Sequence, residues 1–566
     1  MRIALDLKID PFSRKGSYYA IIDNDNKPFG EAVNISTCLN RGRGKHLLFA
    51  LKLCDTKSGK PIKASITADS SRVTLSGGGG KCELCIEPLQ TLRIRSEGVG
   101  FSLQMPTDYA VLAYPQPAGR WAFSCRHPIS TRYMLDPLQG QLKIDAPWNG
   151  MQCDKMLAII LPDENGTAEL AVDEFLSTWV APKRRPAFAQ CLQTVESDFD
   201  KWLETIPTVP RRLEKARRHA AFVNWNSIVN PLGLFQRPAM LMSKRHMDQV
   251  WSWDNCFNAM ALSYHNPALA WDQFMVMVDR QDEFGCFPDA VNNRCEHFRF
   301  SKPPVHGWAF DFARKRNPRF FTRKQLQTAY GWLSRWSNWW LEHRVWPGDS
   351  LPHYLHGNDS GWDNSTMFAK GIPLMAPDLG AILASQLNVI AKLADELGMQ
   401  RAAREWAGRR DILLKALRKD LWRGDHFVAI TRPAGEEVHC DSLVPNIPIM
   451  LGRLLPADIR KQVIKNLRGF ITRHGLATER PDSQYYESNG YWRGPIWAPS
   501  TMLVVSGLHA AGEKKMAAQI AQRFCRTCAK SGFAENFDAL TGDGLRDRSY
   551  TWTASSFMVM AHEFVE

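Results

Sequence analysis

The sequence predicts a protein of two domains, an antiparallel β-sandwich followed by a larger helical domain. Three observations support this prediction. Short alternating runs separated by turn residues fill the chain up to about residue 180, proline and basic residues crowd the stretch after it, and helical periodicity dominates the rest. We therefore place the β-sandwich at residues 1–180, a linker at 181–204 and the helical domain at 205–566.

The first part of the chain has the pattern of strands in an antiparallel sheet. TLRIRS (91–96) and QLKIDA (141–146) alternate apolar and polar residues, and KMLAIILP (155–162) is a continuous apolar run that ends in proline. Alternation of this kind is typical of strands that bury one face. SGGGGK (76–81) reads as a turn, and the linker begins in VAPKRRPAF (180–188), where proline interrupts regular structure.

The second part has the pattern of paired amphipathic helices. Residues 376–397 carry leucine and isoleucine on one face, with Asp378 at the start and Gly398 after the end, as helix caps require. A second helix is expected at 399–422, and similar pairs follow at 441–455 with 457–473 and at 496–511 with 513–530. Long polar loops join these segments, so we expect helical hairpins arranged in a ring, with the loops gathered at one end.

Composition limits the classes of protein that are possible. The 566 residues are 44% hydrophobic and 23% charged, as in globular proteins. The net charge of +13 raises the possibility of nucleic acid binding, but the basic residues are scattered, and the densest groups, 183–185 and 211–219, lack the aromatic or glycine pattern of a nucleic-acid module. We expect no nucleic acid partner. The 20 tryptophans fit either a core or a cleft that stacks on sugar rings.

The 13 cysteines include two pairs with the spacing of metal ligands, CELC (82–85) and CRTC (525–528). They lie far apart, one in an expected strand and one in an expected helix, so we interpret them as structural thiols and expect neither a metal nor another cofactor. The N-terminus has no apolar core of a signal peptide, and no apolar run approaches ~18 residues. A cytoplasmic protein without a membrane contact is the expectation.

Five polar stretches combine aromatic residues with carboxylates or arginine. They are WSWDNCF (251–257), GCFPDA (285–290) with KPPVHGWAF (302–310), GNDSGWDNST (357–366), YYESNGYWRGPIWAPS (485–500) and GFAENFDALTGDG (532–544). Planar carboxylates and guanidinium groups bind sugar hydroxyls, and glycoside hydrolysis needs two carboxyl groups besides. Each acid alone also fits a simpler role, since Asp363 fits a turn and Glu535 fits the N-terminus of a helix.

Taken together and in this order, KPPVHGWAF, SGWDNS, PDLGAIL, YWRGPIW and ENFDALTGDGL resemble glycoside hydrolase family 63 over about residues 240–566. The trehalases, which share its clan, have a similar GWD motif. The resemblance implies an (α/α)6 barrel preceded by a β-rich domain. It also implies inverting hydrolysis of α-linked glucosides, mannosides or their glycerate conjugates.

The resemblance also implies a role for individual residues. Asp363 matches the general acid and Glu535 the general base of the family, while Trp253 and Asp254 match residues that hold the terminal sugar. Sugar contacts are further implied for Trp492, Arg493 and Trp497. Trp362, Asp359 and His306 complete the expected binding site. Asp359 is expected either to bind the sugar or to support the residues that do, and His306 either to be buried or to contact the sugar. Asp359 replaces a frequent glutamate and Thr366 a frequent proline.

The function expected from the sequence is that of an inverting α-glucosidase acting on a small carbohydrate. An α-mannosidase or a glycosylglycerate hydrolase would use the same site. A catalytically silent sugar-binding protein is a further alternative, although both proposed carboxylates are present.

Overall fold

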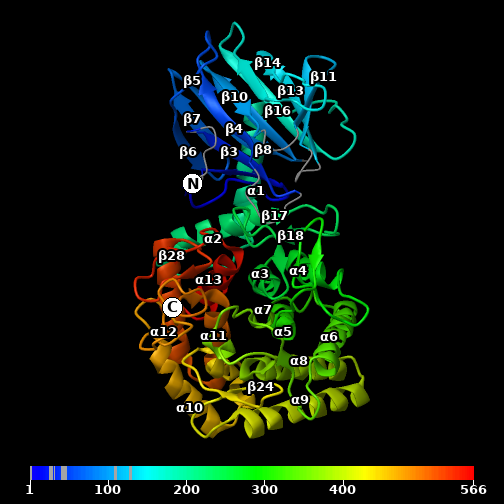
Figure 1. Ribbon diagram of the computed structural model, residues 1–566, viewed down its shortest axis with the longest axis vertical. Coiled ribbons are helices and arrows are strands. Elements are labelled where there is room, and N and C mark those ends of the chain that lie inside the picture. Colours follow the sequence, from blue (N-terminus) through cyan, green and yellow to red (C-terminus); the bar gives the residue numbers. More distant parts are fainter. Residues whose placement is uncertain are drawn as a thin grey trace. The chain divides into compact units, whose positions relative to one another are not determined.

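The computed structural model describes residues 3–23, 30, 32–39, 47–88, 90–106, 111–125 and 131–566. The chain divides into two compact units. The first comprises Met1–Glu204, Phe222–Gly233 and Ser243–Asp248, and the second comprises Thr205–Ala221, Leu234–Met242 and Gln249–Glu566. Figure 1 shows that strands make up most of the first unit and helices most of the second. The prediction of a strand-rich N-terminal region and a helical C-terminal domain is confirmed.

The first unit contains two antiparallel sheets in the described part of the chain. One has the order β1-β6-β7-β8-β9-β16-β13-β12-β11, and the other has the order β14-β15-β10-β4-β3-β2, with β5 paired to β4. The strands are β1 (Ala4–Leu5), β2 (Tyr19–Ile22), β3 (Val33–Thr37), β4 (Leu47–Cys54), β5 (Pro61–Ile62), β6 (Ser65–Asp69), β7 (Val73–Gly77), β8 (Gly80–Glu87), β9 (Thr91–Glu97), β10 (Gly100–Gln104), β11 (Val111–Gln116), β12 (Arg120–Cys125), β13 (Arg132–Gln139), β14 (Gln141–Asp145), β15 (Leu157–Leu161) and β16 (Thr167–Phe175).

The apolar faces of these two sheets share one core. Phe49 of β4 meets Tyr133 of β13 with ring centroids 6.0 Å apart, and Leu103 of one sheet and Leu135 of the other belong to the same buried cluster. The alternating runs in the sequence account for this arrangement, because successive side chains of a strand point to opposite faces of its sheet. TLRIRS lies in β9, QLKIDA in β14 and KMLAIILP in β15.

Residues 188–204, which the proline-rich pattern led us to include in a linker, form the helix α1 (Phe188–Glu204). The helix buries Phe188, Cys191, Leu192, Val195, Phe199, Trp202 and Leu203, a set with helical spacing on one face. Burial of this face explains why the segment is ordered as a helix although prolines precede it.

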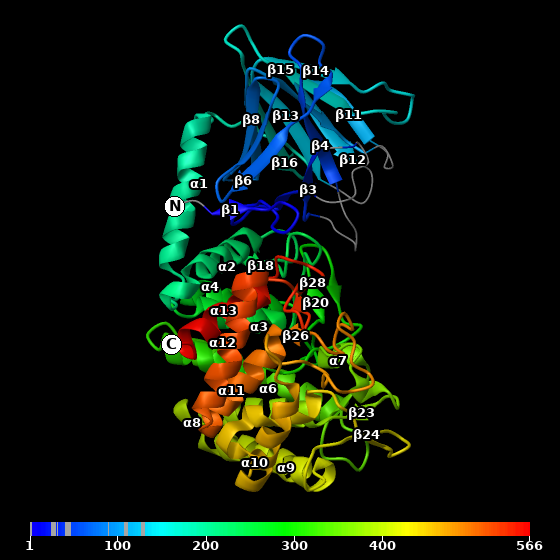
Figure 2. The same cartoon turned by 90° about the vertical axis from the view of Figure 1, so that its left-hand side faces the viewer.

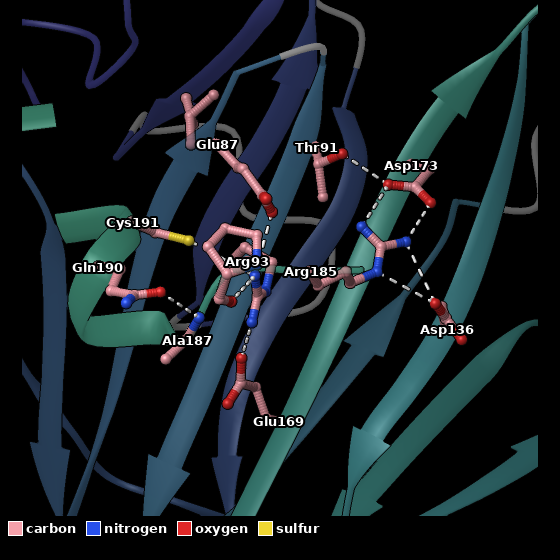
Figure 3. Close-up of polar contacts among 12 residues, drawn as sticks. Glu87, Thr91, Arg93, Asp136, Glu169, Asp173, Arg185, Ala187, Gln190 and Cys191 are labelled. Atoms are coloured by element: carbon pink, nitrogen blue, oxygen red, sulfur yellow. Dashed lines mark hydrogen bonds and ion pairs between the residues drawn. The ribbon is translucent and has the colours of Figure 1, made fainter. Parts of the chain in front are cut away.

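Two arginines, the buried Arg93 and the partly buried Arg185, hold the start of α1 and the chain before it against the large sheet, as Figure 3 shows. Arg93 of β9 donates to Glu87 at 3.1 Å and to the Cys191 sulfur at 3.5 Å, and it also pairs with Glu169. Arg185 pairs with Asp136 at 3.1 Å and with Asp173 at 2.5 Å. One member of the basic group at 183–185 is therefore engaged within the protein, which removes it from any polyanion-binding surface.

The second unit consists of helices joined by long loops and short strands. Its helical elements, with α2 shared between the two units, are η1 (Arg211–Leu213), α2 (Glu214–Ser227), α3 (Asp254–Leu262), α4 (Pro267–Val278), α5 (His306–Arg316), α6 (Arg323–His343), α7 (Gly357–Ser360), η2 (Thr366–Phe368), α8 (Pro377–Glu396), α9 (Gln400–Leu421), η3 (Val444–Leu454), α10 (Ala457–Leu467), η4 (Arg468–Phe470), α11 (Ala498–Ala511), α12 (Lys514–Ser531) and α13 (Thr551–Glu563).

Six of these elements follow one another in a closed ring. α3 packs on α5, α5 on α8, α8 on η3, η3 on α11 and α11 on α13, and α13 returns to α3. Helices α6 and α9 pack on α8 from outside, and α12 packs on α11 and α13. The sequence explains the two layers, since α13 is buried from Thr551 to Ala561, whereas α9 buries one face only.

The element η3 differs from the prediction for 441–455. It is a 3-10 helix that contains Pro445 and Pro448, and Gly452 has a φ of 56°. Proline removes a backbone donor and clashes with the preceding turn of an α-helix, and this explains why the segment does not continue as one. The neighbouring predictions are confirmed, because 376–397 contains α8 and 399–422 contains α9.

The loops of this unit carry short antiparallel strand pairs. They are β19 (Val250–Trp251) with β20 (Ala290–Val291) and β21 (Glu296–His297), β22 (His353–Tyr354) with β23 (Leu374–Met375), β24 (Ala429–Thr431) and β25 (Glu437–Val438), and β26 (Ile496–Trp497) with β27 (Asn536–Phe537) and β28 (Gly544–Leu545). Figure 2 shows α7, β20, β23, β26 and β28 on the same side of this unit. The loops with the sequence motifs therefore gather there. The remaining strands are β17 (Ile228–Val229) and β18 (Ala239–Met240).

The cysteine pairs lie where the patterns predicted them. Cys82 and Cys85 are buried in β8, and Cys525 and Cys528 are buried in α12. Within the described residues, no group of three or more His, Cys, Asp or Glu side chains is arranged to hold a metal ion. None of the helices in the described ranges has both the length and the apolar character that crossing a lipid bilayer requires.

Candidate active site

Asp363 follows a tight loop whose shape depends on two glycines. Gly361 has a φ of 72°, and a Cβ there would lie 2.4 Å from the Trp253 ring. At Gly357, a Cβ would lie 2.1 Å from the Asp363 carbonyl oxygen. Only glycine allows both the left-handed backbone and these close approaches. The glycines thus bring the loop against Trp253 and leave Asp363 partly exposed.

Asp359 anchors this loop to its neighbours. Its carboxylate accepts the backbone N–H of Ser301 at 2.8 Å and of Leu355 at 2.8 Å, and it pairs with Arg344 at 3.0 Å. The residue is only 2% exposed. These contacts favour the role of a residue that supports the loop over that of a sugar ligand, and a sugar contact of Asp359 stays a prediction.

Glu535 lies directly before β27 and is 5% exposed. Its backbone N–H donates to the Asp547 carbonyl at 2.7 Å. Burial raises the pKa of Glu535 to about 7, the negative charge of Asp547 adds to the rise, and Arg546 and a hydrogen bond from Tyr491 oppose it. A carboxyl group with this pKa exchanges a proton readily near neutral pH, which is what a general acid or base requires.

Tyr491 links the two candidate carboxylates. Burial raises the pKa of its phenol well above the ordinary value, and the negative charges of Glu535 and Asp363 both contribute. The loop of Asp363 also contacts the backbone of Tyr491, because the Asn364 side chain donates to the Gly490 carbonyl and accepts the Trp492 N–H, each at 2.9 Å. In the motif YWRGPIW, the sequence indicated Trp492, Arg493 and Trp497 as candidates but not Tyr491. The sequence signal for Tyr491 was its position directly before Trp492.

Asp254 begins α3 and belongs to the same cluster. It is 2% exposed, and burial raises its pKa well above the usual range, while Lys302 opposes the rise and Asp289 and Glu535 add to it. The Tyr550 hydroxyl lies 3.5 Å from one Asp254 oxygen. The prediction that Asp254 contributes to the site stays a prediction, but the structure brings it near Glu535.

Asp289 and Lys302 are functional candidates that sequence reasoning did not single out. Lys302 pairs with Asp289 at 3.0 Å and donates to the Asn358 carbonyl at 2.5 Å. Burial raises the pKa of Asp289, Lys302 opposes this rise, and Asp363 contributes to it. Asp289 lies in the motif GCFPDA and Lys302 in the motif KPPVHGWAF. The sequence thus indicated both motifs but not these two side chains.

The tryptophans expected to contact sugar form a buried cluster. Trp253 is 2% exposed, and Trp362, Trp492 and Trp497 are each 1% exposed. Trp492 stacks on Trp497 with ring centroids 4.0 Å apart and lies 4.8 Å from Trp362. This burial fits a supporting role, and direct sugar contacts from these four tryptophans stay a prediction. Their packing supports the loops that carry the acids.

His306 and Arg493 differ in their exposure to solvent. His306 is 1% exposed and packs 4.9 Å from the Phe287 ring, and burial lowers its pKa to about 3. It is therefore a neutral, buried residue, which agrees with the first of the two roles expected for it, and a sugar contact of His306 stays a prediction. The Arg493 side chain is 34% exposed and pairs with Glu487 at 2.6 Å, so it stays accessible at the edge of the site.

Replacement of Trp253 by alanine tests the structural role of the cluster. We expect a loss of about 3–5 kcal/mol in the free energy of unfolding, because a fully buried indole is removed. Urea denaturation measures this loss. In Trp346→Ala, which removes a side chain 37% exposed, the loss should be smaller. A Trp253→Ala protein with unchanged stability and weakened sugar affinity would instead favour a direct sugar contact.

Comparisons with known proteins identify the family of the helical part of the chain. Residues 247–553 match the family model of the mannosylglycerate hydrolase MGH1-like glycoside hydrolase domain. Mannosylglycerate hydrolase of Rubrobacter radiotolerans is 22% identical over 416 residues, which cover 58% of this chain and 92% of that protein. Glucosylglycerate hydrolase of Mycolicibacterium hassiacum is 22% identical over 430 residues, covering 58% of this chain and 94% of that protein.

Among solved structures, the fold is similar to the family 63 mannosylglycerate hydrolase of Thermus thermophilus in complex with glucose. The TM-score is 0.54 and the identity 18%, over 61% of this chain and 99% of that chain. The match of more than half of the chain to one family model identifies the family. The chain belongs to the mannosylglycerate hydrolase MGH1-like members of glycoside hydrolase family 63 and is an O-glycosyl hydrolase.

Proposed function

We propose that the protein is an inverting α-glycosidase in which Asp363 is the general acid and Glu535 the general base. One observation carries the proposal, namely that the loops of both carboxylates meet at Tyr491. Asn364, next to Asp363, binds the peptide groups on both sides of Tyr491, and Arg546, whose neighbour Asp547 accepts the Glu535 N–H, lies 4.7 Å from the centre of the phenol ring. The two environments also differ, since Asp363 is partly exposed whereas Glu535 is buried. Two carboxyl groups with different surroundings suit two different proton-transfer roles.

In the proposed reaction, Asp363 gives its proton to the glycosidic oxygen as the bond to the anomeric carbon breaks. Glu535 takes a proton from a water that attacks the opposite face of the sugar, so the configuration inverts in one displacement. With a pKa of about 7, Glu535 is substantially ionised at neutral pH and can accept this proton. Asp254 and Asp289, both buried beside these groups, would accept hydrogen bonds from sugar hydroxyls, with Arg493 at the rim.

We further propose that the fold is an (α/α)6 barrel preceded by an antiparallel β-sandwich, with domains at 1–180 and 205–566 joined by 181–204. The closed succession of α3, α5, α8, η3, α11 and α13, with further helices outside it, supports the barrel. A rigid ring with its loops at one end would hold acids from distant parts of the chain together.

An α-linked glucoside is the proposed substrate, and an α-mannoside or a glycosylglycerate is the second candidate. Relatives named mannosylglycerate hydrolase and glucosylglycerate hydrolase favour the second candidate, as does the net charge of +13, which suits an anionic aglycone. A small substrate of this kind also fits the cytoplasm.

The deciding experiment is proton NMR of the purified protein with α-linked disaccharides of glucose and mannose and with α-glucosyl- and α-mannosylglycerate. We expect one of them to release its sugar as the β-anomer within the first minutes, before mutarotation. Initial release of the α-anomer would exclude the inverting mechanism, and binding without hydrolysis of every compound would favour a silent sugar-binding protein.

A further inference from the structure

Tyr491 has an unusual backbone conformation beside the candidate site. Its φ is 64°, in the left-handed region, where residues other than glycine are uncommon. Glycine precedes it at 490, yet the left-handed position itself carries a tyrosine. A bulky residue stays in this region only when its surroundings hold it there, and such positions gather at functional sites.

The residue that holds Tyr491 is Asn364, which directly follows Asp363. Its side-chain amide donates to the Gly490 carbonyl at 2.9 Å, and its side-chain oxygen accepts the Trp492 N–H at 2.9 Å. One side chain thus binds the peptide groups on both sides of Tyr491. In addition, the indole N–H of Trp497 donates to the Tyr491 carbonyl at 2.8 Å.

The Tyr491 side chain is directed toward the other carboxylate. The negative charge of Glu535 contributes to the raised pKa of the Tyr491 phenol, and the phenol in turn opposes the rise in the pKa of Glu535. The Glu535 N–H donates at 2.7 Å to the carbonyl of Asp547, which directly follows Arg546. The guanidinium of Arg546 lies 4.7 Å from the centre of the phenol ring, and Arg546 donates to the Asn489 carbonyl at 3.1 Å. Arg546 also has a left-handed φ of 61°. Two constrained residues therefore meet next to Glu535.

We propose that Tyr491 is a positioning residue that holds the Glu535 carboxylate through its hydroxyl, and that Asn364 couples it to the loop of Asp363. The inference rests on the proposed roles of Asp363 and Glu535. A general base must be held within a fraction of an ångström of its water, and a phenol donor on a fixed backbone does this. This coupling keeps the positions of the Asp363 and Glu535 carboxyl groups fixed relative to each other when a substrate enters.

The test is the pH profile of kcat/KM in Tyr491→Phe, with the substrate that the NMR panel identifies. The phenol hydrogen bond favours the ionised form of Glu535 and lowers its pKa, so its removal raises that pKa. The acidic limb of the profile should move to higher pH, and the maximum should fall by about 10- to 100-fold. Other groups facing Glu535, which stay in place, are Asp254, Arg546, Asp547 and Tyr550.

Tyr485→Phe is the matched control, because Tyr485 is 53% exposed in the same loop. Its profile should coincide with that of the unchanged protein. A folded Tyr491→Phe protein whose acidic limb stays in place overturns the inference, even if its activity falls. If Glu535→Gln is inactive in that case, only the positioning role fails; activity in Glu535→Gln would instead refute the proposed function.

Asn364→Ala completes a double-mutant cycle with Tyr491→Phe. If Asn364 acts through Tyr491, the fold-reduction of kcat/KM in the double variant should be smaller than the product of the two single reductions. The reason is that the second substitution removes an interaction that the first has already disrupted. Losses that simply multiply would overturn the coupling between the two loops. Thermal melts of all variants establish that each is folded before its kinetics are compared.

Discussion

Glutamine in place of Glu535 is expected to lower kcat/KM by roughly 10²- to 10⁴-fold, the contribution typical of a general acid or base. The amide keeps the size of the side chain but cannot accept a proton from water. The fold should be retained, since the change removes a charge that burial already disfavours. Initial rates of hydrolysis and a thermal melt measure the two effects separately.

The pH dependence of the unchanged protein belongs to the same prediction. As the base, Glu535 must be ionised, so activity should fall as the pH drops through the Glu535 pKa of about 7. Sodium azide should restore part of the activity of Glu535→Gln and yield a β-glycosyl azide from an α-linked substrate, because azide attacks without losing a proton. Glu436→Gln, at an exposed position, is the control and should keep full activity. An α-glycosyl azide, or near-normal hydrolysis by Glu535→Gln, would argue against the assignment.

Replacement of Asp363 by asparagine should have an effect that depends on the leaving group. A sugar leaving group needs a proton, so hydrolysis of an α-linked disaccharide should fall by roughly 10²- to 10⁴-fold. Fluoride leaves the corresponding α-glycosyl fluoride with little protonation, so the rate of hydrolysis of that substrate should fall far less. The ratio of kcat/KM for the two substrates is the measurement.

Asp411→Asn, on the exposed face of α9, controls for a general effect of losing one carboxylate. It should leave both rates unchanged. Equal losses on the disaccharide and the fluoride in a folded Asp363→Asn protein would mean that Asp363 is not the proton donor. The loop around it should remain in place, because Asp359 and the two glycines hold its backbone.

Local patterns were sufficient to predict many of the secondary elements. The apolar face at 376–397 predicted α8, and the alternation in TLRIRS predicted β9, because both periods follow directly from backbone geometry. The segment 441–455 was predicted as an ordinary helix, but it became the 3-10 element η3 where Pro445 and Pro448 interrupt it. The prolines at 180–188 likewise hid the periodicity that forms α1.

The sequence by itself determined the family, the strand-rich and helical parts, and the motifs in which the candidate acids lie, because each depends on the order of residues that are neighbours in the chain. Only the tertiary structure decided which side chains of those motifs face the site. It buried Trp253 and His306, paired Asp359 with Arg344, and brought the backbone of Tyr491 against Asn364 beside Asp363. A motif specifies the chemistry of its residues, whereas access and proximity arise only when loops from distant helices pack together.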